Sequence, residues 1–185
     1  MAVFPVVIDA CVLFNASVRD TLLRAAEYGL YRLHWSEKIL DETTKNLIQD
    51  GRMNSVQAKH FVEQLARAFP DATVTVTDDL IAVMKNDPKD RHVSAAAVTA
   101  SAQVIVTFNT DDFRAEHLTH LNIEAQHPDV FLLYLFSRQP QLLIRILIEQ
   151  SEDLDGITFD QLLLYMQKHV PLFITALRNH IDTEV

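Results

Sequence analysis

Four acidic residues lie far apart in this chain of 185 residues, and each stands where a metal ligand is expected in an α/β fold. Asp9 directly follows the apolar run at 6–8, and Asp112 comes shortly after the segment 104–109. Glu42 lies in a helix-like stretch, and Asp90 stands near the start of an alanine-rich one. If the two apolar runs form neighbouring parallel strands, their carboxyl ends open at the same edge, where open α/β sheets bind ligands.

Carboxylates that are crowded together repel one another unless a cation lies among them. Oxygen ligands of this kind suit Mg²⁺ or Mn²⁺. The spacing therefore predicts a divalent-metal site at one edge of a parallel sheet, and the hydrolysis of phosphodiesters is a reaction that such a site performs.

Each acid also has a purely structural interpretation. Asp9 would cap the turn after its strand, as Asp does in many turns. Glu42 would belong to a solvated helix face, and periodicity does not choose between it and Asp41. Asp111 and Asp112 would form an ordinary turn. What favours a functional site is the joint placement of the four acids.

Asp90 has the strongest structural interpretation of the four. In the segment Asp87-Pro88-Lys89-Asp90, Asp87 is predicted as the N-cap and Pro88 as the first helical residue. Asp90 would then be the acidic third residue of the helix, where a carboxylate favours the helix dipole. Asp87 would supply most of that stabilisation, so the carboxylate of Asp90 would be partly available for another role.

Strand and helix patterns alternate along the first two thirds of the chain. The predicted strands are 3–8, 30–35, 73–77, 103–108 and 122–125, and the predicted helices are 19–29, 36–50, 55–69, 78–85 and 88–102. Ser36 is expected to be the N-cap of its helix. Alternation of this kind predicts βαβ units and a central parallel sheet flanked by helices.

After residue 128 the pattern becomes entirely helical. Apolar-rich helices are predicted around 131–136, 142–148, 159–166 and 171–181. Pro140, Pro171 and the capping box Thr158-x-x-Gln161 mark helix starts. We therefore expect an α/β domain over 1–128 and an all-helical domain over 129–185.

Composition narrows the class of protein. Nearly half of the residues are hydrophobic (49%), with only 3 Gly, so the chain is expected to form a compact globule. The single cysteine, Cys11, excludes an internal disulfide framework and fits a reducing cytosol. No basic leader precedes an apolar stretch, and the run 131–136 is far shorter than the ~20 residues of a membrane helix. These features predict a soluble, cytoplasmic protein without a membrane partner.

The net charge of −9 argues against a general nucleic-acid binder, because such proteins normally neutralise phosphates with a basic surface. A bound metal would cancel the charge of the four acids locally. The acidity is therefore compatible with a nucleic-acid substrate that is held at the metal centre.

Taken together, the four segments resemble the PIN-domain ribonucleases, and in particular toxins of the VapC type. The resemblance covers about residues 3–126, and its motifs are the segments 7–13, 35–42, 87–97 and 106–113. The family's acids fall on Asp9, Glu42, Asp90 and Asp112. The helical tail is similar to extensions found on a longer subgroup of these proteins.

The resemblance implies a PIN-like fold and a metal-dependent endoribonuclease. Mg²⁺ or Mn²⁺ would be the cofactor, the four acids would be both its ligands and the catalytic residues, and RNA would be the substrate. It also implies a cognate antitoxin as partner, in a type II toxin–antitoxin pair, and a homodimer formed through the PIN domain. Thr107 and Asn109 would hold a carboxylate or a substrate phosphate. Arg91 is a further candidate phosphate ligand, but the favoured interpretation is that it pairs with Asp87. For His92 the favoured interpretation is packing or helix capping.

The chain departs from the family pattern at two positions. Many relatives carry Ser, Thr or Asn where this chain has Cys11, whose sulfur is a poorer partner for Asp9. Some relatives carry an acid where this chain has Asn109. The fourth ligand position then falls to Asp112, with Asp111 as a competitor.

Three other interpretations remain. In the first, the chain would be a non-catalytic PIN-like module that binds a partner through its helical tail, but such a module does not need four acids. A flap-type DNA nuclease is expected to be larger and more basic. A response-regulator receiver would carry an adjacent acid pair after its first strand, whereas Asp9 is followed by Ala10.

Overall fold

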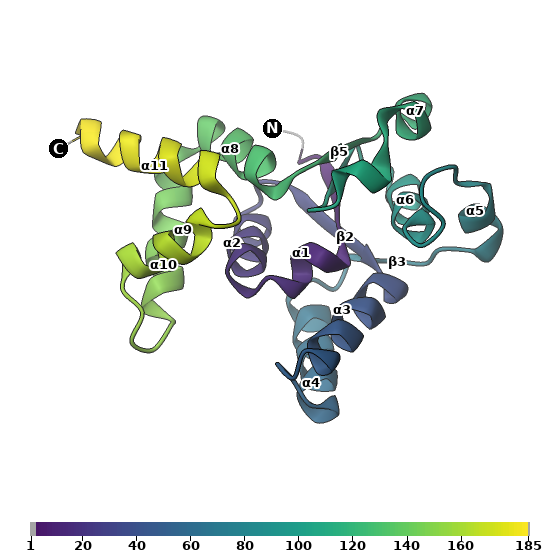
Figure 1. The fold of residues 1–185 in the computed structure, drawn as a ribbon, viewed down its shortest axis with the longest axis horizontal. Helices are drawn as coiled ribbons and strands as arrows, with labels where there is room; N and C mark the ends of the chain where they lie inside the picture. Colours follow the sequence, from purple (N-terminus) through teal and green to yellow (C-terminus); the bar gives the residue numbers. More distant parts are fainter. Residues whose placement is uncertain (1–2, 185) are drawn as a thin grey trace. The chain divides into compact units, whose positions relative to one another are not determined.

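The computed structural model describes residues 3–184. The chain forms two compact units (Figure 1): one contains the residues up to Phe14 together with Tyr31–Gln126, and the other contains Asn15–Leu30 together with the residues from His127 onward. No pattern in the sequence indicated that 15–30 would join the C-terminal helices. The domain boundary near residue 128 stays a prediction.

The first unit is built on a five-stranded parallel sheet with the strand order β3-β2-β1-β4-β5. The strands are β1 (Pro5–Ile8), β2 (Arg32–Ser36), β3 (Thr73–Val74), β4 (Val104–Val106) and β5 (Glu124–Gln126). β1 is the central strand and pairs with β4, and the valine and isoleucine side chains of both strands are buried, as expected for strands covered on both faces. The prediction of a PIN-like α/β fold with a parallel sheet and additional C-terminal helices is confirmed.

The register of β1 and β4 sets the position of the first acid. Ile8 pairs with Val106, and the Asp9 amide donates a hydrogen bond of 3.0 Å to the Val106 carbonyl. The Thr107 amide in turn donates to the carbonyl of Gln126 on β5, also at 3.0 Å. Asp9 and Thr107 therefore leave the sheet at the same edge, at the carboxyl ends of adjacent parallel strands.

Helices and short helical turns surround this sheet. They are α1 (Ala10–Phe14), α3 (Glu37–Gln49), α4 (Ser55–Ala68), α5 (Asp78–Val83), α6 (Arg91–Thr99), η1 (Thr110–Phe113), α7 (Ala115–Leu118) and η2 (Thr119–Leu121). α6 packs against β1, β2 and β4, and α3 packs against β2, α1 and α4 (Figure 1). Ser36 caps α3 as predicted, because its hydroxyl accepts a hydrogen bond from the Ile39 amide.

The start of α6 differs from the prediction. Asp87 is not the N-cap: the helix begins at Arg91, and Asp90 is the N-cap residue. The segment 87–90 forms a turn in which the Asp90 amide donates to the Asp87 carbonyl at 3.0 Å. Asp followed by Pro suits the first two positions of such a turn as well as it suits a helix start. Asp90 makes no side-chain cap hydrogen bond, so its carboxylate is not used to start the helix.

The second unit is helical. It contains α2 (Ala16–Glu27), α8 (Pro128–Arg138), α9 (Pro140–Glu152), α10 (Phe159–Gln167) and α11 (Pro171–Glu184). The starts predicted at Pro140 and Pro171 and the Thr158–Gln161 capping box are confirmed. α2 packs against α9 and α10.

Over residues 3–184, no single helix has the length and apolar composition needed to cross a membrane. The pair α8 and α9, which is bent by 120° at its junction, meets the criterion when the two helices are taken together.

Candidate active site

Asp9 is held by three hydrogen bonds at the edge of the sheet. Its Oδ2 accepts from the Thr107 hydroxyl at 2.7 Å and from the Cys11 thiol at 3.2 Å, and its Oδ1 accepts from the Ala10 amide at 2.7 Å. Burial raises the pKa of Asp9, while these donors act in the opposite direction. The three donors come from the start of α1 and from the residue that follows β4, so the position of the carboxylate is fixed before any ligand binds.

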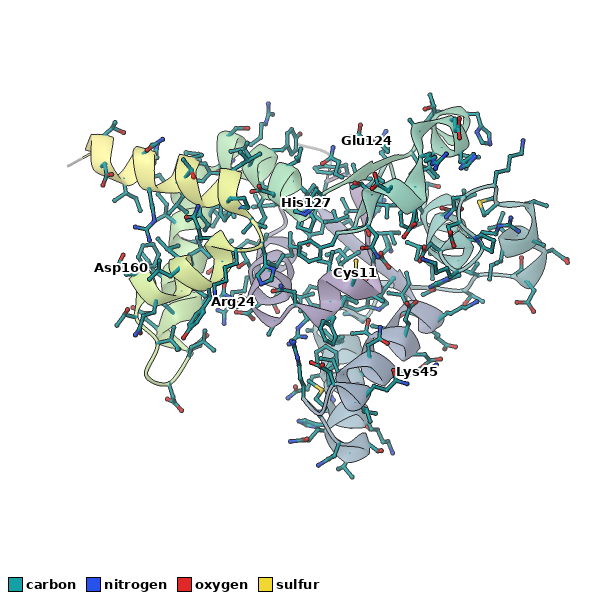
Figure 2. The ribbon with its side chains drawn as sticks, in the orientation of Figure 1. Cys11, Arg24, Lys45, Glu124, His127 and Asp160 are labelled. Carbon is teal, nitrogen blue, oxygen red and sulfur yellow. The ribbon has the colours of Figure 1, made fainter. Side chains whose placement is uncertain are left out.

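Cys11 acts as a partner of Asp9. Besides its bond to Asp9, the sulfur of Cys11, the residue labelled in Figure 2, lies 3.4 Å from the Thr107 hydroxyl and accepts from the Phe108 amide at 3.3 Å. Burial, reinforced by the negative charge of Asp9, raises the pKa of the thiol to about 12. The thiol is therefore protonated at neutral pH and donates to Asp9, which excludes a role as nucleophile.

Asp90 is the least satisfied carboxylate of the site. It is 8% exposed, and its Oδ2 has no hydrogen-bond partner. Burial raises its pKa to about 6, and the carboxylates of Asp9 and Asp112 add to that increase. The fold thus brings Asp9, Asp90 and Asp112 within electrostatic reach of one another.

Glu42 faces α6 from α3. Its Oε2 lies 3.3 Å from Nε2 of the buried His92, whose Nδ1 is 2.9 Å from the Lys89 carbonyl. The contact with His92 is the main cause of the lowered pKa of Glu42. Asp41 is exposed. The contact joins residues 50 positions apart on two helices, so no local pattern in the sequence indicated it.

Asp112 lies in η1 with its side chain half-buried. Its Oδ2 is 3.6 Å from the ammonium group of Lys89, which is itself 71% exposed. Asp112 raises the pKa of Asp90, whereas the neighbouring Asp111 is exposed and is not among the groups that do so. The geometry therefore supports Asp112 over Asp111 as the fourth acid. No pattern in the sequence singled out Lys89 as a residue of the site.

The three residues suggested for substrate binding have different surroundings. Thr107 is fully buried and holds a carboxylate, that of Asp9. Asn109 is exposed, and its backbone amide donates to the Thr107 hydroxyl at 3.1 Å. The predicted Arg91–Asp87 pair is not present: the Arg91 guanidinium donates instead to the Asn86 carbonyl at 3.2 Å, because the 87–90 turn places that carbonyl beside the start of α6.

The acidic side chains of the site do not enclose a metal ion by themselves. Within the described residues, no group of three or more His, Cys, Asp or Glu side chains is arranged to hold an ion. Mg²⁺, however, keeps several waters in proteins and is commonly held by one or two carboxylates together with substrate phosphates. The unpartnered, buried Oδ2 of Asp90 fits such a loosely held ion. The set of four ligands stays a prediction.

Comparison with known proteins identifies the family. Residues 5–111 match the PIN domain. The chain belongs to the PIN domain family. A relative named "Putative ribonuclease VapC50", from Mycobacterium tuberculosis (strain ATCC 25618 / H37Rv), is 55% identical over 56 residues. That alignment spans 30% of this chain and 33% of the relative. No solved structure matches the chain.

Proposed function

We propose that this PIN-domain protein is a metal-dependent endoribonuclease, the toxin of a type II toxin–antitoxin pair. It hydrolyses RNA phosphodiesters at Asp9, Glu42, Asp90 and Asp112 with Mg²⁺ or Mn²⁺. The observation that carries the proposal is the buried Asp90 carboxylate, which has no partner for Oδ2 and lies within reach of two other carboxylates. The name of the Mycobacterium tuberculosis relative supports the assignment to RNA.

The residues of the site have distinct tasks in this proposal. Asp9, Asp90 and Asp112 hold the cation, and Thr107 and Cys11 fix the orientation of Asp9. Glu42, kept ionised by His92, accepts a hydrogen bond from the attacking water. A divalent ion bound here would lower the pKa of a water ligand and stabilise the charge that develops on the phosphate.

Lys89 provides positive charge beside the acids. Its ammonium group is exposed and pairs with Asp112 over 3.6 Å, a distance at which the pair is weak in water. A lysine in this position contacts a substrate phosphate as a mobile point charge. It brings the polyanionic substrate to a site that is otherwise acidic.

The proposal includes an antitoxin, a homodimer through the PIN domain and a cytoplasmic location. The acidic chain, with a net charge of −9, is complementary to a basic peptide that reaches the carboxylates. Expression from the native operon, followed by purification and mass measurement, tests both partners. Recovery of a monomer without a tightly bound second protein contradicts them.

Cleavage of total RNA by the purified protein tests the activity. The reactions contain Mg²⁺, Mn²⁺ or EDTA, with the Asp90→Asn variant beside the wild type. The proposal predicts discrete fragments with either metal, and none with EDTA or with the variant. Metal-independent fragments, or equal cleavage by the variant, contradict it because they indicate another nuclease.

A second candidate function is a non-catalytic PIN-like module that binds a partner through its helices. The observation in its favour is that no three ligand-type side chains among residues 3–184 form a closed metal group. A folded wild-type protein that cleaves no RNA with either metal would support this candidate.

A further inference from the structure

The outer side of β3 is an open edge of the parallel sheet. β3 is the last strand on its side, and it pairs only with β2. The Trp35 amide donates to the Ala72 carbonyl at 3.0 Å, so the backbone groups of Ala72 and Val74 face β2. Successive residues of a strand direct these groups to opposite sides, so those of Thr73 face outward. Those of Thr75 do the same, because the chain continues without a turn or bend to α5 (Figure 1). Within residues 3–184, the outward amides and carbonyls of both threonines make no hydrogen bond.

The composition of this edge favours the addition of a strand. Residues 73–77 read Thr-Val-Thr-Val-Thr, so all of them are uncharged and β-branched, a type of residue that suits strands. The three threonines are exposed and the two valines are half-buried. Open sheet edges are normally protected by a charged side chain, a proline or a bulge. None of these lies within 73–77, so the backbone of this segment is open to another strand.

Acidic residues at both ends of the edge limit the kind of partner. Asp71 precedes the segment, and Asp78 and Asp79 follow it. All three are exposed, and none forms an ion pair with a described residue. Antiparallel pairing of two copies about Thr75 would bring Asp71 of one copy beside Asp79 of the other, and facing like charges destabilise a strand pair. A strand with basic residues at its ends meets opposite charges there instead.

We propose that the outer edge of β3 binds an extended segment of a partner protein, with β-branched residues at its centre and lysine or arginine at both ends. The segment adds a strand to the sheet, because its backbone pairs with the outward groups of Thr73 and Thr75. Its side chains lie beside those of Val74 and Val76 on one face and beside the threonines on the other. The surface consists of residues 71–79 and contains none of the four acids of the candidate active site. The inference therefore goes beyond the proposed nuclease and does not depend on it.

Titration with synthetic peptides tests this surface on the full chain. The probe is the peptide acetyl-Lys-Thr-Val-Thr-Val-Thr-Lys-amide, and the matched control peptide carries Glu in place of both Lys. Each is added in EDTA to the ¹⁵N-labelled protein, and the backbone amide NMR signals are followed. We expect saturable shifts that are concentrated in residues 71–79 and in β2. The lysine peptide should bind at least about fivefold more tightly than the glutamate peptide, because each exposed ion pair adds a modest attraction and the glutamates are repelled.

Variants of the edge separate backbone pairing from charge. Thr75→Pro removes the outward amide at the centre of the edge but no bond to β2, and should weaken binding of the lysine peptide at least about 10-fold. Asp71→Asn combined with Asp79→Asn should reduce the preference for the lysine peptide to about twofold or less. Asp160→Asn, an exposed position of the second unit, should have no effect. If Thr75→Pro does not fold, two lysine peptides that are N-methylated at alternate residues replace it. One of the two cannot donate to the edge and should lose binding, whereas the other should retain it.

Several results overturn the inference. Absence of saturable binding, or equal binding of the lysine and glutamate peptides, excludes a strand with basic ends. Shifts centred on the four acids of the candidate active site instead of 71–79 show that a basic peptide binds there. Unchanged binding by Thr75→Pro, or equal binding of the two N-methylated peptides, excludes backbone pairing at this edge. Self-association of the chain alone in sedimentation experiments, if Thr75→Pro abolishes it, assigns the edge to a second copy.

Discussion

The two units of the chain differ in how they satisfy their buried polar groups. Within residues 3–184, the buried side-chain nitrogens and oxygens without a hydrogen-bond partner all belong to the first unit. They are found in His34, Asn86, Asp90, Ser94, His117 and Gln126, and in His92, whose Nε2 has only the ion-pair contact with Glu42. The buried polar side chains of the second unit are paired. The Thr21 hydroxyl donates to Gln150 at 2.7 Å, and the Gln150 amide donates to the Ser17 carbonyl at 3.0 Å.

Two buried aspartates show what the difference means. Asp129, in the second unit, is 4% exposed and accepts from the amides of Leu172 and Phe173 at 3.0 and 2.8 Å. These amides begin α11, so the carboxylate caps that helix and complements its dipole. Asp90 is nearly as buried, but it caps nothing and one oxygen has no partner. Pairing indicates a structural role for Asp129, whereas the unpaired oxygen of Asp90 is consistent with the ligand-binding role that we propose for it.

The largest effect is expected on catalysis. Asp90→Asn should lower the rate of RNA cleavage by about 1000-fold or more, because it removes a charged ligand from the site where charge develops. The measurement is single-turnover cleavage of one defined RNA in Mg²⁺. Asp160→Asn, at an exposed position of α10, is the matched control and should leave the rate unchanged. Residual cleavage by Asp90→Asn within 10-fold of the wild type would place Asp90 outside the catalytic site.

At Asp129, a substitution is expected to lower the stability of the protein and to leave its catalytic rate unchanged. Asp129→Ala should lower the free energy of unfolding by about 3 kcal/mol, since it leaves two amides at the start of α11 without their charged acceptor. Urea denaturation followed by circular dichroism measures this loss. The rate of cleavage per folded molecule should be that of the wild type. A fall in that rate would show that Asp129 contributes to activity as well as to the fold.

The pH dependence of stability tests the burial of Asp90 independently of cleavage. The pKa of Asp90 is about 6 in the folded protein and 3.8 ordinarily, so the folded state binds more protons than the unfolded state between these values. The stability of the metal-free protein should therefore fall as pH rises from about 4 to 6, by about 2 kcal/mol from this residue.

Urea denaturation in EDTA at pH 4.5 and pH 7 measures that change. Asp90→Asn should be more stable than the wild type at pH 7 and should show a smaller pH dependence. Asp9, whose pKa is also raised, acts in the same direction, whereas Glu42, whose pKa is lowered, acts in the opposite direction. An Asp90→Asn variant with the same pH dependence as the wild type would contradict the assignment.

A smaller effect is expected from the residues that orient Asp9. Thr107→Val removes the hydroxyl that donates to Asp9 at 2.7 Å and should lower the cleavage rate about 10-fold, as the loss of an outer partner of a metal ligand does. Cys11→Ser replaces one donor by another and should change the rate by no more than about twofold. A larger loss in Cys11→Ser than in Thr107→Val would mean that sulfur has a specific role.

The central sheet and its acidic edge could be predicted from the sequence because they depend on local patterns. The apolar runs that became β1 and β4 are continuous and buried, and parallel pairing places the residues that follow them at one edge. Asp9 and Asp112 could therefore be placed near each other before the structure was known. The strand at 73–77 was predicted too long, since only Thr73 and Val74 pair with β2.

The other features of the fold and of the site could not be predicted, because they depend on contacts between distant segments. Asp87-Pro88 suits a helix start and a turn equally well, and the bond from the Asp87 amide to Asp112 is formed only in the folded chain. The pattern of α2 shows that one face is buried, but not that this face packs against α9 and α10. The unpaired amide of Asn86 could not be predicted either, because the absence of a partner is a property of the whole fold.

Binding of Mn²⁺ to the isolated protein tests the central claim most directly, since the claim is that Asp90 and the acidic residues around it form a cation site. The electron paramagnetic resonance signal of free Mn²⁺ is measured at increasing protein concentration for the wild type, Asp90→Asn and Asp160→Asn. We expect the wild type and Asp160→Asn to bind Mn²⁺ with equal affinity and Asp90→Asn to bind at least about 10-fold more weakly. Equal binding by all three proteins, or binding by none, would contradict the account.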